Sequence, residues 1–227
     1  MVPLSPGFPT MAETLSATPF VIAVDGPAAS GKGTISKLLA QHFKLQHLDT
    51  GLLYRAVGLA MLDADGDLDD PEACEDVAKR LDLTRLDPDV LAQHHVGEAA
   101  SKVALHPPVR AALLEAQRDF AHAMPGAVLD GRDIGTVVCP DASAKLFITA
   151  SLDARAQRRH AQAVLKDPSV SLQAISDDLA KRDARDAGRS NAPLAQAGDA
   201  LLLDTTNLGI DAAFEAAQAF VAGKLHA

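Results

Sequence analysis

The stretch from residue 20 to residue 39 constrains the fold most, because it joins a strand pattern, a glycine-rich loop and a helix pattern. Phe20–Asp25 reads FVIAVD, an apolar run typical of a buried strand. The loop 26–34 follows, and from Ile35 apolar residues return at i, i+3 and i+4, which is helical spacing. Glycines let backbone N–H groups turn toward an anion, and the helix N-terminus adds partial positive charge. The stretch therefore predicts a phosphate-binding loop, although a surface turn is the simpler alternative.

This loop departs at one position from the phosphate-loop pattern G-x-x-x-x-G-K-[ST]. Gly26, Gly31 and Lys32 match the pattern, but Gly33 comes next and the hydroxyl group is supplied by Thr34. Lys32 would provide a mobile cation for the β- and γ-phosphates of a nucleotide. The G-K-G-T ending resembles the loop of nucleoside monophosphate kinases, which makes a nucleotide the expected ligand.

The composition excludes several classes of protein. The length of 227 residues suits one domain, or one domain with an insertion. Hydrophobic residues make up 48% of the chain, which is enough for a sizeable core. A net charge of −9 argues against binding to a nucleic-acid polymer, which needs a basic surface. Cys74 and Cys139 are the only cysteines and lack ligand spacing, so we expect no zinc site and a cytoplasmic location. No apolar run approaches the roughly 18 residues of a membrane span, so we expect no membrane association.

Strand-like and helix-like segments alternate along the chain, which predicts an α/β fold with a five-stranded parallel sheet flanked by helices. Residues 1–18 are rich in Pro, Ser, Thr and Gly and are expected to form a disordered leader, so the folded domain would span 19–227. The expected strands are 20–25, 46–48, 127–130, 144–149 and 200–204; the expected helices are 33–43, 52–62, 71–81, 98–105, 109–123, 153–165, 172–187 and 211–225.

The second predicted helix carries a single charge. It is apolar nearly all round, Arg55 is its only charged residue, and Thr50 is its expected N-cap. Burying a charge without a partner would cost several kcal/mol, so we expect Arg55 to have an anionic partner. Further along the chain, residues 82–97 show no clean period and are interrupted by Pro88, so no element is assigned there.

Three predicted strands end in an acid: Asp25, Asp130 and Asp204. Ligands of open parallel sheets bind beyond the carboxyl ends of the strands, which makes these acids candidates for a site. An acid there can also cap the next loop, and this interpretation is favoured for Asp204. Asp130 has the position of the acid that supports magnesium in phosphate-loop enzymes. It opens the sequence DGRD, in which Arg132 could face a phosphate and Asp133 could accept hydrogen bonds from a ligand.

Arginines gather on the sixth and seventh predicted helices. Arg155, Arg158 and Arg159 share one face of the sixth, which is either a solvated basic face or a mobile cationic lid. The apolar stripe of the seventh, beginning at Leu172, continues into Arg182 and Asp186. Inward charges at a helix end usually line a cleft, although ion pairs within the helix could also satisfy them. A cation-rich cleft opposite a phosphate loop suits phosphoryl transfer, which needs positioning and charge neutralisation.

Taken together, these residues resemble the bacterial cytidylate kinases. The resemblance rests on six blocks that run in family order from about residue 20 to residue 225, and their combination is specific although single blocks are not. Adenylate kinases have a similar loop, but DGRD and RDARD are not their pattern. The six blocks are GPAASGKGT (26–34), LDTGLLYR (48–55), ASKVALHPPVR (100–110), DGRDIGTVVCPDA (130–142), RDARDAGR (182–189) and LLLDTTNL (201–208).

The resemblance implies a P-loop nucleoside monophosphate kinase fold, with an acceptor-binding insertion at about 52–124 and a lid at about 153–189. It further implies ATP as the phosphate donor, Mg²⁺ as the cofactor, CMP or dCMP as the acceptor, and a monomeric enzyme. Thr34 would hold the magnesium, directly or through a water molecule. The catalytic residues would be Lys32, Arg132, Arg182 and Asp130. The donor-binding residues would be Gly26, Pro27, Ala28, Ala29, Ser30, Gly31, Lys32, Gly33, Thr34, Arg155 and Arg159.

The resemblance also divides the acceptor site among named residues. The pairing edge of cytosine offers one N–H donor and two acceptors, which suits one carboxylate flanked by guanidinium groups. Uracil would instead point a carbonyl oxygen at that carboxylate. Arg55 and Arg132 would hold the α-phosphate; Ser101, Arg182 and Asp186 would face the sugar; Arg110, Asp133 and Arg189 would read the base.

One departure from the family leaves the choice of acceptor open. Family members commonly carry a longer insertion with strand-like segments where this chain has the short stretch 83–97, so we expect a shortened acceptor-binding subdomain. The alternatives are a kinase of the same fold that prefers UMP or AMP, and a non-catalytic nucleotide-sensing protein with a phosphate loop.

Overall fold

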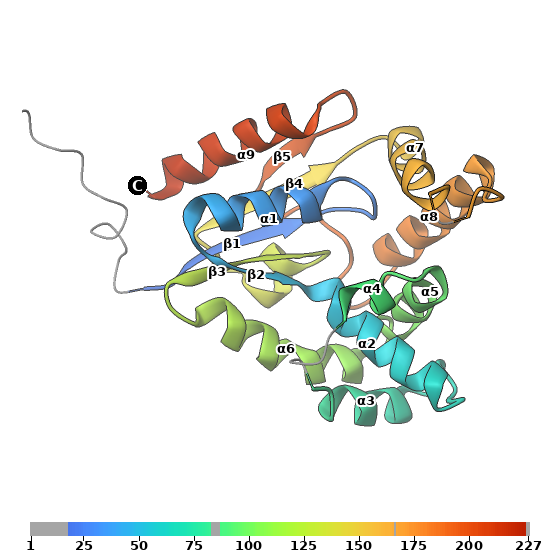
Figure 1. Ribbon diagram of the computed structural model, residues 1–227. Coiled ribbons are helices and arrows are strands. Elements are labelled where there is room, and N and C mark those ends of the chain that lie inside the picture. The colour runs from blue at the N-terminus through green and yellow to red at the C-terminus, as the bar shows by residue number, and fades with distance from the viewer. Residues whose placement is uncertain (1–17, 83–86, 166, 226–227) are drawn as a thin grey trace, which may run out of the picture.

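Five parallel strands form one sheet in the centre of the protein (Figure 1). The computed structural model describes residues 18–82, 87–165 and 167–225. The strand order is β2-β3-β1-β4-β5, and every neighbouring pair is parallel, which confirms the predicted sheet. The strands are β1 (Phe20–Asp25), β2 (Gln46–Asp49), β3 (Gly126–Gly131), β4 (Ala144–Thr149) and β5 (Leu201–Asp204).

Helices cover both faces of this sheet, which explains why its inner strands are continuous apolar runs. Helices α1 (Lys32–Phe43) and α9 (Ile210–Leu225) pack on one face, over a core that includes Ile22 and Leu146. Helix α6 (Pro107–His122) packs on the other face. The register places Val24 beside Asp130, so the phosphate-loop strand and the strand before DGRD end together.

Two further groups of helices stand at the carboxyl ends of the strands (Figure 1). The first contains α2 (Thr50–Asp63), α3 (Pro71–Lys79), α4 (Pro88–Leu91) and α5 (His94–Val103), and it shares a core with α6 around Leu53 and Val109. The second contains α7 (Leu152–Ala163) and α8 (Leu172–Ala187), which pack together through Ala156, Ile175 and Leu179. The two groups therefore flank the edge where ligands of parallel sheets bind.

The structure corrects several local predictions. Asp49, and not Thr50, caps α2, because its Oδ1 accepts a hydrogen bond from the Gly51 N–H at 2.9 Å. The Thr50 hydroxyl instead donates to the Asp130 carbonyl at 2.8 Å. Helix α5 starts at His94, four residues before the predicted start, and Leu172 is 42% exposed and does not join the inner stripe of α8.

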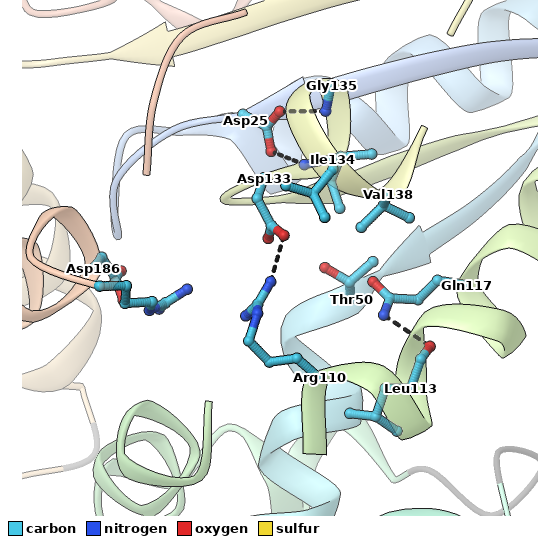
Figure 2. Close-up of polar contacts among 12 residues, drawn as sticks. Asp25, Thr50, Arg110, Leu113, Gln117, Asp133, Ile134, Gly135, Val138 and Asp186 are labelled. Atoms are coloured by element: carbon cyan, nitrogen blue, oxygen red, sulfur yellow. Dashed lines mark hydrogen bonds and ion pairs between the residues drawn. The ribbon is translucent and has the colours of Figure 1, made fainter. Parts of the chain in front are cut away.

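A π-helical turn, Ile134–Val138, follows DGRD and was not predicted. Buried Asp25 accounts for the position of this turn, because the Asp25 carboxylate accepts hydrogen bonds from the Ile134 and Gly135 N–H groups at 2.7 and 2.8 Å (Figure 2).

Two predictions concern segments that lie largely or partly outside the described residues. These are residues 1–17 of the expected leader and residues 83–86 of the shortened stretch. In the described part of the chain, no helix has both the length and the apolar character to cross a membrane.

Candidate functional site

A cleft opens at the carboxyl ends of β1, β2 and β3, between the two groups of helices. Residues from the phosphate loop, α2, α5, α6, α7, α8 and the DGRD segment line it. Predicted site residues that do not line it are Gly26, Pro27, Ser30, Gly31, Thr34 and Arg155. Predicted site residues that line it are Ala28, Ala29, Lys32, Gly33, Arg55, Ser101, Arg110, Asp130, Arg132, Asp133, Arg159, Arg182, Asp186 and Arg189.

Two glycines give the loop before α1 its shape. A Cβ atom on Gly26 would lie 2.0 Å from the Ile148 carbonyl oxygen, so the close approach of β4 requires glycine. Gly31 has a φ of +91° and is the N-cap of α1, with no side chain to occupy the first N–H groups of the helix. The Ser30 hydroxyl is buried and has no hydrogen-bond partner among the described residues. The loop is therefore built to present backbone N–H groups to an anion.

Lys32 lies in a part of the cleft that contains both positively and negatively charged side chains. Burial and the neighbouring Arg132 guanidinium lower the pKa of the Lys32 ammonium group to about 8, against the opposing effect of Asp130 and Asp49. Burial and the charge of Asp130 in turn raise the pKa of Asp49. An anionic ligand would favour the charged form of Lys32, so this part of the cleft suits negative charge.

Among the described residues, no ion pair joins Arg55 or Arg182 to a carboxylate. Arg55 donates to the carbonyl oxygens of Leu91 and Gln93 at 2.6 and 3.3 Å, so the anionic partner expected for it stays a prediction that a ligand would have to meet. Burial, followed by the charges of Arg182 and Arg159, lowers the pKa of Arg55 to about 10. The buried Nε of Arg182 has no hydrogen-bond partner in the described part of the chain. Both guanidinium groups can therefore receive an anionic ligand.

Asp186 organises two other arginines of the cleft. Its Oδ2 accepts a hydrogen bond from Arg132 Nε at 2.7 Å, and its Oδ1 accepts one from Arg189. Burial opposes ionisation of Asp186, but Arg132 and Arg189 hold its pKa below the ordinary value. One carboxylate is thus shared by two guanidinium groups, which fixes their directions and leaves net positive charge on this wall.

Arg110 and Asp133 form a buried ion pair in the lining of the cleft. Arg110 reaches from α6 to Asp133, which lies just after β3, and both side chains are less than 10% exposed (Figure 2). The Arg110 guanidinium carbon also lies 5.5 Å from the centre of the Tyr54 ring. A fixed carboxylate beside a fixed guanidinium offers an acceptor and a donor to the edge of a flat polar ring.

Comparison with known proteins identifies the family to which this arrangement belongs. The family model for cytidylate kinase matches residues 22–222. The chain belongs to the cytidylate kinase family. It is 55% identical over 202 residues to the cytidylate kinase of Rhizobium meliloti, covering 89% of this chain and 95% of the relative. It is 57% identical over 201 residues to the cytidylate kinase of Azorhizobium caulinodans, covering 88% and 97% of the two chains.

A solved structure supports the fold alone. The crystal structure of an uncharacterized protein from Eubacterium ventriosum matches 89% of this chain and 98% of its own chain, with a TM-score of 0.52 and 14% identity. At this identity the match says nothing of function. The family assignment instead agrees with the six ordered sequence blocks, since their residues supply most of the lining of the cleft.

Arg155 and Arg158 hold α7 in place in this cytidylate kinase fold, so the interpretation as a solvated basic face is wrong for both. Buried Arg155 donates to the carbonyl oxygens of Ala150 and Ala28 at 2.9 and 3.2 Å and to Asp183 at 2.6 Å. Arg158 donates to the Thr205 hydroxyl at 3.0 Å. These bonds tie α7 to the phosphate loop, to α8 and to the loop after β5.

Two contacts at the site were missed at the sequence level. The Nε2 atom of His47 lies 2.8 Å from Asp130 Oδ2, and Arg185 Nη1 donates to the Ser101 hydroxyl at 2.7 Å. The partners lie 83 and 84 residues apart in sequence, so no local spacing could have paired them.

The position of Asp204 agrees with the predicted role of capping the next loop. Its exposed carboxylate accepts a hydrogen bond from the Thr206 N–H at 2.8 Å.

Proposed function

We propose that the protein transfers the γ-phosphoryl group of ATP to CMP or dCMP, giving ADP and CDP or dCDP. One observation supports this most strongly. In this chain of the cytidylate kinase family, the phosphate loop lines the same cleft as several arginines, and the buried Nε of one of them, Arg182, has no hydrogen-bond partner among the described residues. A buried Arg110–Asp133 pair in the lining of that cleft has the polarity to meet the pairing edge of cytosine. The cleft thus offers side chains or backbone groups of suitable charge and polarity to the donor phosphates, to the acceptor phosphate and to the acceptor base.

On the donor side, we propose that the loop 26–34 surrounds the ATP phosphates with backbone N–H groups and that Lys32 neutralises the β- and γ-phosphates. Arg159 lines the cleft from α7 and would approach the donor phosphates from the lid. Arg155 would act beside it, and its present bonds to Ala28 and Asp183 connect the lid to the loop.

On the acceptor side, we propose the division of roles that the family resemblance implies. Arg55 and Arg132 would bind the α-phosphate, and Arg182 with Asp186 would face the sugar. Ser101 would also face the sugar. The residues that would read the base are Arg110, Asp133 and Arg189, all of which line the cleft.

The reaction needs little covalent work from the protein. An oxygen of the acceptor α-phosphate would attack the γ-phosphorus, and the bond from that phosphorus to the ADP oxygen would break. Lys32, Arg132 and Arg182 would hold the two nucleotides in line and neutralise charge on the transferring group. Asp130 would complete the catalytic set as support for the magnesium site.

The residues of the cleft fit a magnesium ion that is bound mainly through the nucleotide. Among the described residues, no group of three or more His, Cys, Asp and Glu side chains could hold a metal ion. Mg²⁺ commonly keeps several waters and takes only one or two protein ligands beside the substrate phosphates, so no such group is needed. Thr34 would hold it, directly or through a water, and the ion when bound would neutralise phosphate charge. Asp130 and Asp49 supply hard oxygen atoms close to Lys32.

The decisive first test is product formation. Purified protein incubated with ATP, Mg²⁺ and CMP should produce CDP and ADP in equal amounts, measured by chromatography of the nucleotides. A protein that binds ATP but transfers no phosphoryl group to any nucleoside monophosphate would instead be a nucleotide sensor. A Lys32→Met variant, which lacks the cation of the phosphate loop, serves as the control with reduced transfer.

Asp133→Asn should reduce the preference for CMP over UMP by about 10-fold or more. Uracil places a carbonyl oxygen where cytosine has its amino group, and a carboxylate facing that oxygen leaves an acceptor unpaired at a cost of roughly 1–3 kcal/mol. The asparagine amide can donate to the same oxygen. The measurement is the ratio of kcat/KM for CMP and UMP, with exposed Asp141→Asn as the matched control. An unchanged ratio would remove Asp133 from base reading.

The pH dependence of kcat/KM for ATP should report the lysine of the loop. Lys32 is charged below its pKa of about 8 in the free enzyme, so kcat/KM should fall as the pH rises through that value. Bound ATP raises the same pKa, so kcat measured at saturation should stay constant to a higher pH. Profiles between about pH 7.5 and 10 check this. A kcat/KM that stays level or increases over that range would contradict it.

We propose a single kinase domain over 19–227, with the acceptor-binding insertion at about 52–124 and the lid at about 153–189. The separate small cores around Leu53 and around Ile175 support this division. A monomeric, cytoplasmic enzyme acting on small nucleotides remains the expectation from the sequence.

A further inference from the structure

Arg185 makes two side-chain contacts that none of the roles above uses. It lies on α8, and its Nη1 donates to the hydroxyl oxygen of Ser101 at 2.7 Å. Its Nη2 donates to Oε1 of Glu98 at 3.0 Å. Both partners lie on α5, so a single guanidinium group spans from the lid side to the acceptor side of the cleft.

Arg185 differs from its neighbours on α8 in what its side chain contacts. Arg182 and Asp186 line the cleft, while Arg185, three residues after the first and one before the second, is directed at α5. Its side chain is 24% exposed, and that of Glu98 is 38% exposed. A partly exposed Arg–Glu pair adds little to stability by itself, so the Glu98 contact is better suited to orienting the guanidinium group.

The contact also determines what the Ser101 hydroxyl can do. Ser101 is buried and lines the cleft, and its oxygen accepts the hydrogen bond from Arg185. A hydroxyl group that accepts from a cation keeps its own hydrogen available as a donor. With the oxygen held in this way, the donor can be directed at an acceptor atom of a ligand in the cleft.

We infer that Arg185 is a positioning residue that orients Ser101 toward the monophosphate acceptor, with Glu98 holding the guanidinium group in place. The inference rests on the proposed function. Arg185 acts through Ser101 and does not itself contact the reacting phosphates. Its loss should weaken acceptor binding selectively, because the donor loop lies on another wall of the cleft.

The test compares Arg185→Ala with Lys181→Ala, an exposed cation of the same helix. Arg185→Ala should raise the KM and the calorimetric Kd for CMP by about 10-fold, the loss expected for a charged hydrogen bond. The KM for ATP, the kcat and the melting temperature should change little, and Lys181→Ala should resemble the wild type. Glu98→Gln, which keeps an acceptor for Arg185, should fall between the two.

A double-mutant cycle separates action through Ser101 from an independent effect. In a Ser101→Ala background, the further change Arg185→Ala should alter the Kd for CMP by less than about 2-fold. Additive losses, equal losses for ATP and CMP, or an unchanged Kd in the single variant would each overturn the inference. If the wild type neither binds nor phosphorylates CMP, the proposed function fails and this inference fails with it.

Discussion

Lys32→Met is expected to lower kcat about 10²–10³-fold while the protein stays folded. Lys32 is the lysine of the phosphate loop, it lines the cleft, and its pKa of about 8 shows how strongly burial and Arg132 act on its charge. During the reaction, the Lys32 ammonium group would stay beside the γ-phosphoryl group while negative charge shifts toward the leaving ADP. Methionine fills a similar volume without the cation, so the loss would measure electrostatic stabilisation.

The control for this variant is Lys37→Met, which removes an exposed lysine from the same helix, α1. It should keep wild-type kcat and KM. Circular dichroism should give the same spectrum for both variants. A Lys32→Met enzyme with nearly normal kcat would exclude Lys32 from the catalytic set.

Arg132→Ala is expected to lower kcat by a similar amount, about 10²–10³-fold. Its Nε donates to Asp186 at 2.7 Å and its Nη1 donates to the Gly131 carbonyl at 3.2 Å, so the guanidinium group that lines the cleft is fixed in direction. A cation preorganised in this way would stabilise charge on the transferring group without having to reorient during the reaction. The effect should therefore appear in kcat and not only in KM.

The fold should survive this change, because Asp186 keeps its contact with Arg189. Stopped-assay kinetics with saturating ATP and CMP give kcat, and thermal unfolding checks the structure. Arg80→Ala, at an exposed pair on the end of α3, is the control and should behave as the wild type. Loss of CMP affinity with an unaltered kcat would reassign Arg132 to ground-state binding alone.

The sheet and the loop could be predicted from the sequence because their signals are local. An apolar run such as Phe20–Asp25 must be buried on both faces, and a glycine loop followed by a helix admits few other geometries. Asp130 could be assigned to the site because strand ends meet at one edge of a parallel sheet. The neighbouring register of β1 and β3 confirms that their ends meet.

The partners of the charged residues could not be predicted, because they come from distant elements. Arg155 pairs with Asp183 across two helices, and Arg185 reaches Ser101 across 84 residues. Helical spacing shows which residues share a face of one helix, but not which helix that face meets. For Arg55 the hydrogen bonds to the carbonyl oxygens of Leu91 and Gln93 come from residues more than thirty positions away, which a sequence pattern does not encode.

The measurement that tests the central claim most directly is a comparison of CMP, dCMP, UMP and AMP as acceptors with ATP and Mg²⁺. The Arg110–Asp133 pair in the cleft should make kcat/KM for CMP or dCMP at least about 10-fold higher than for UMP and AMP. Turnover of AMP or UMP that equals or exceeds that of both cytidine nucleotides would contradict the account.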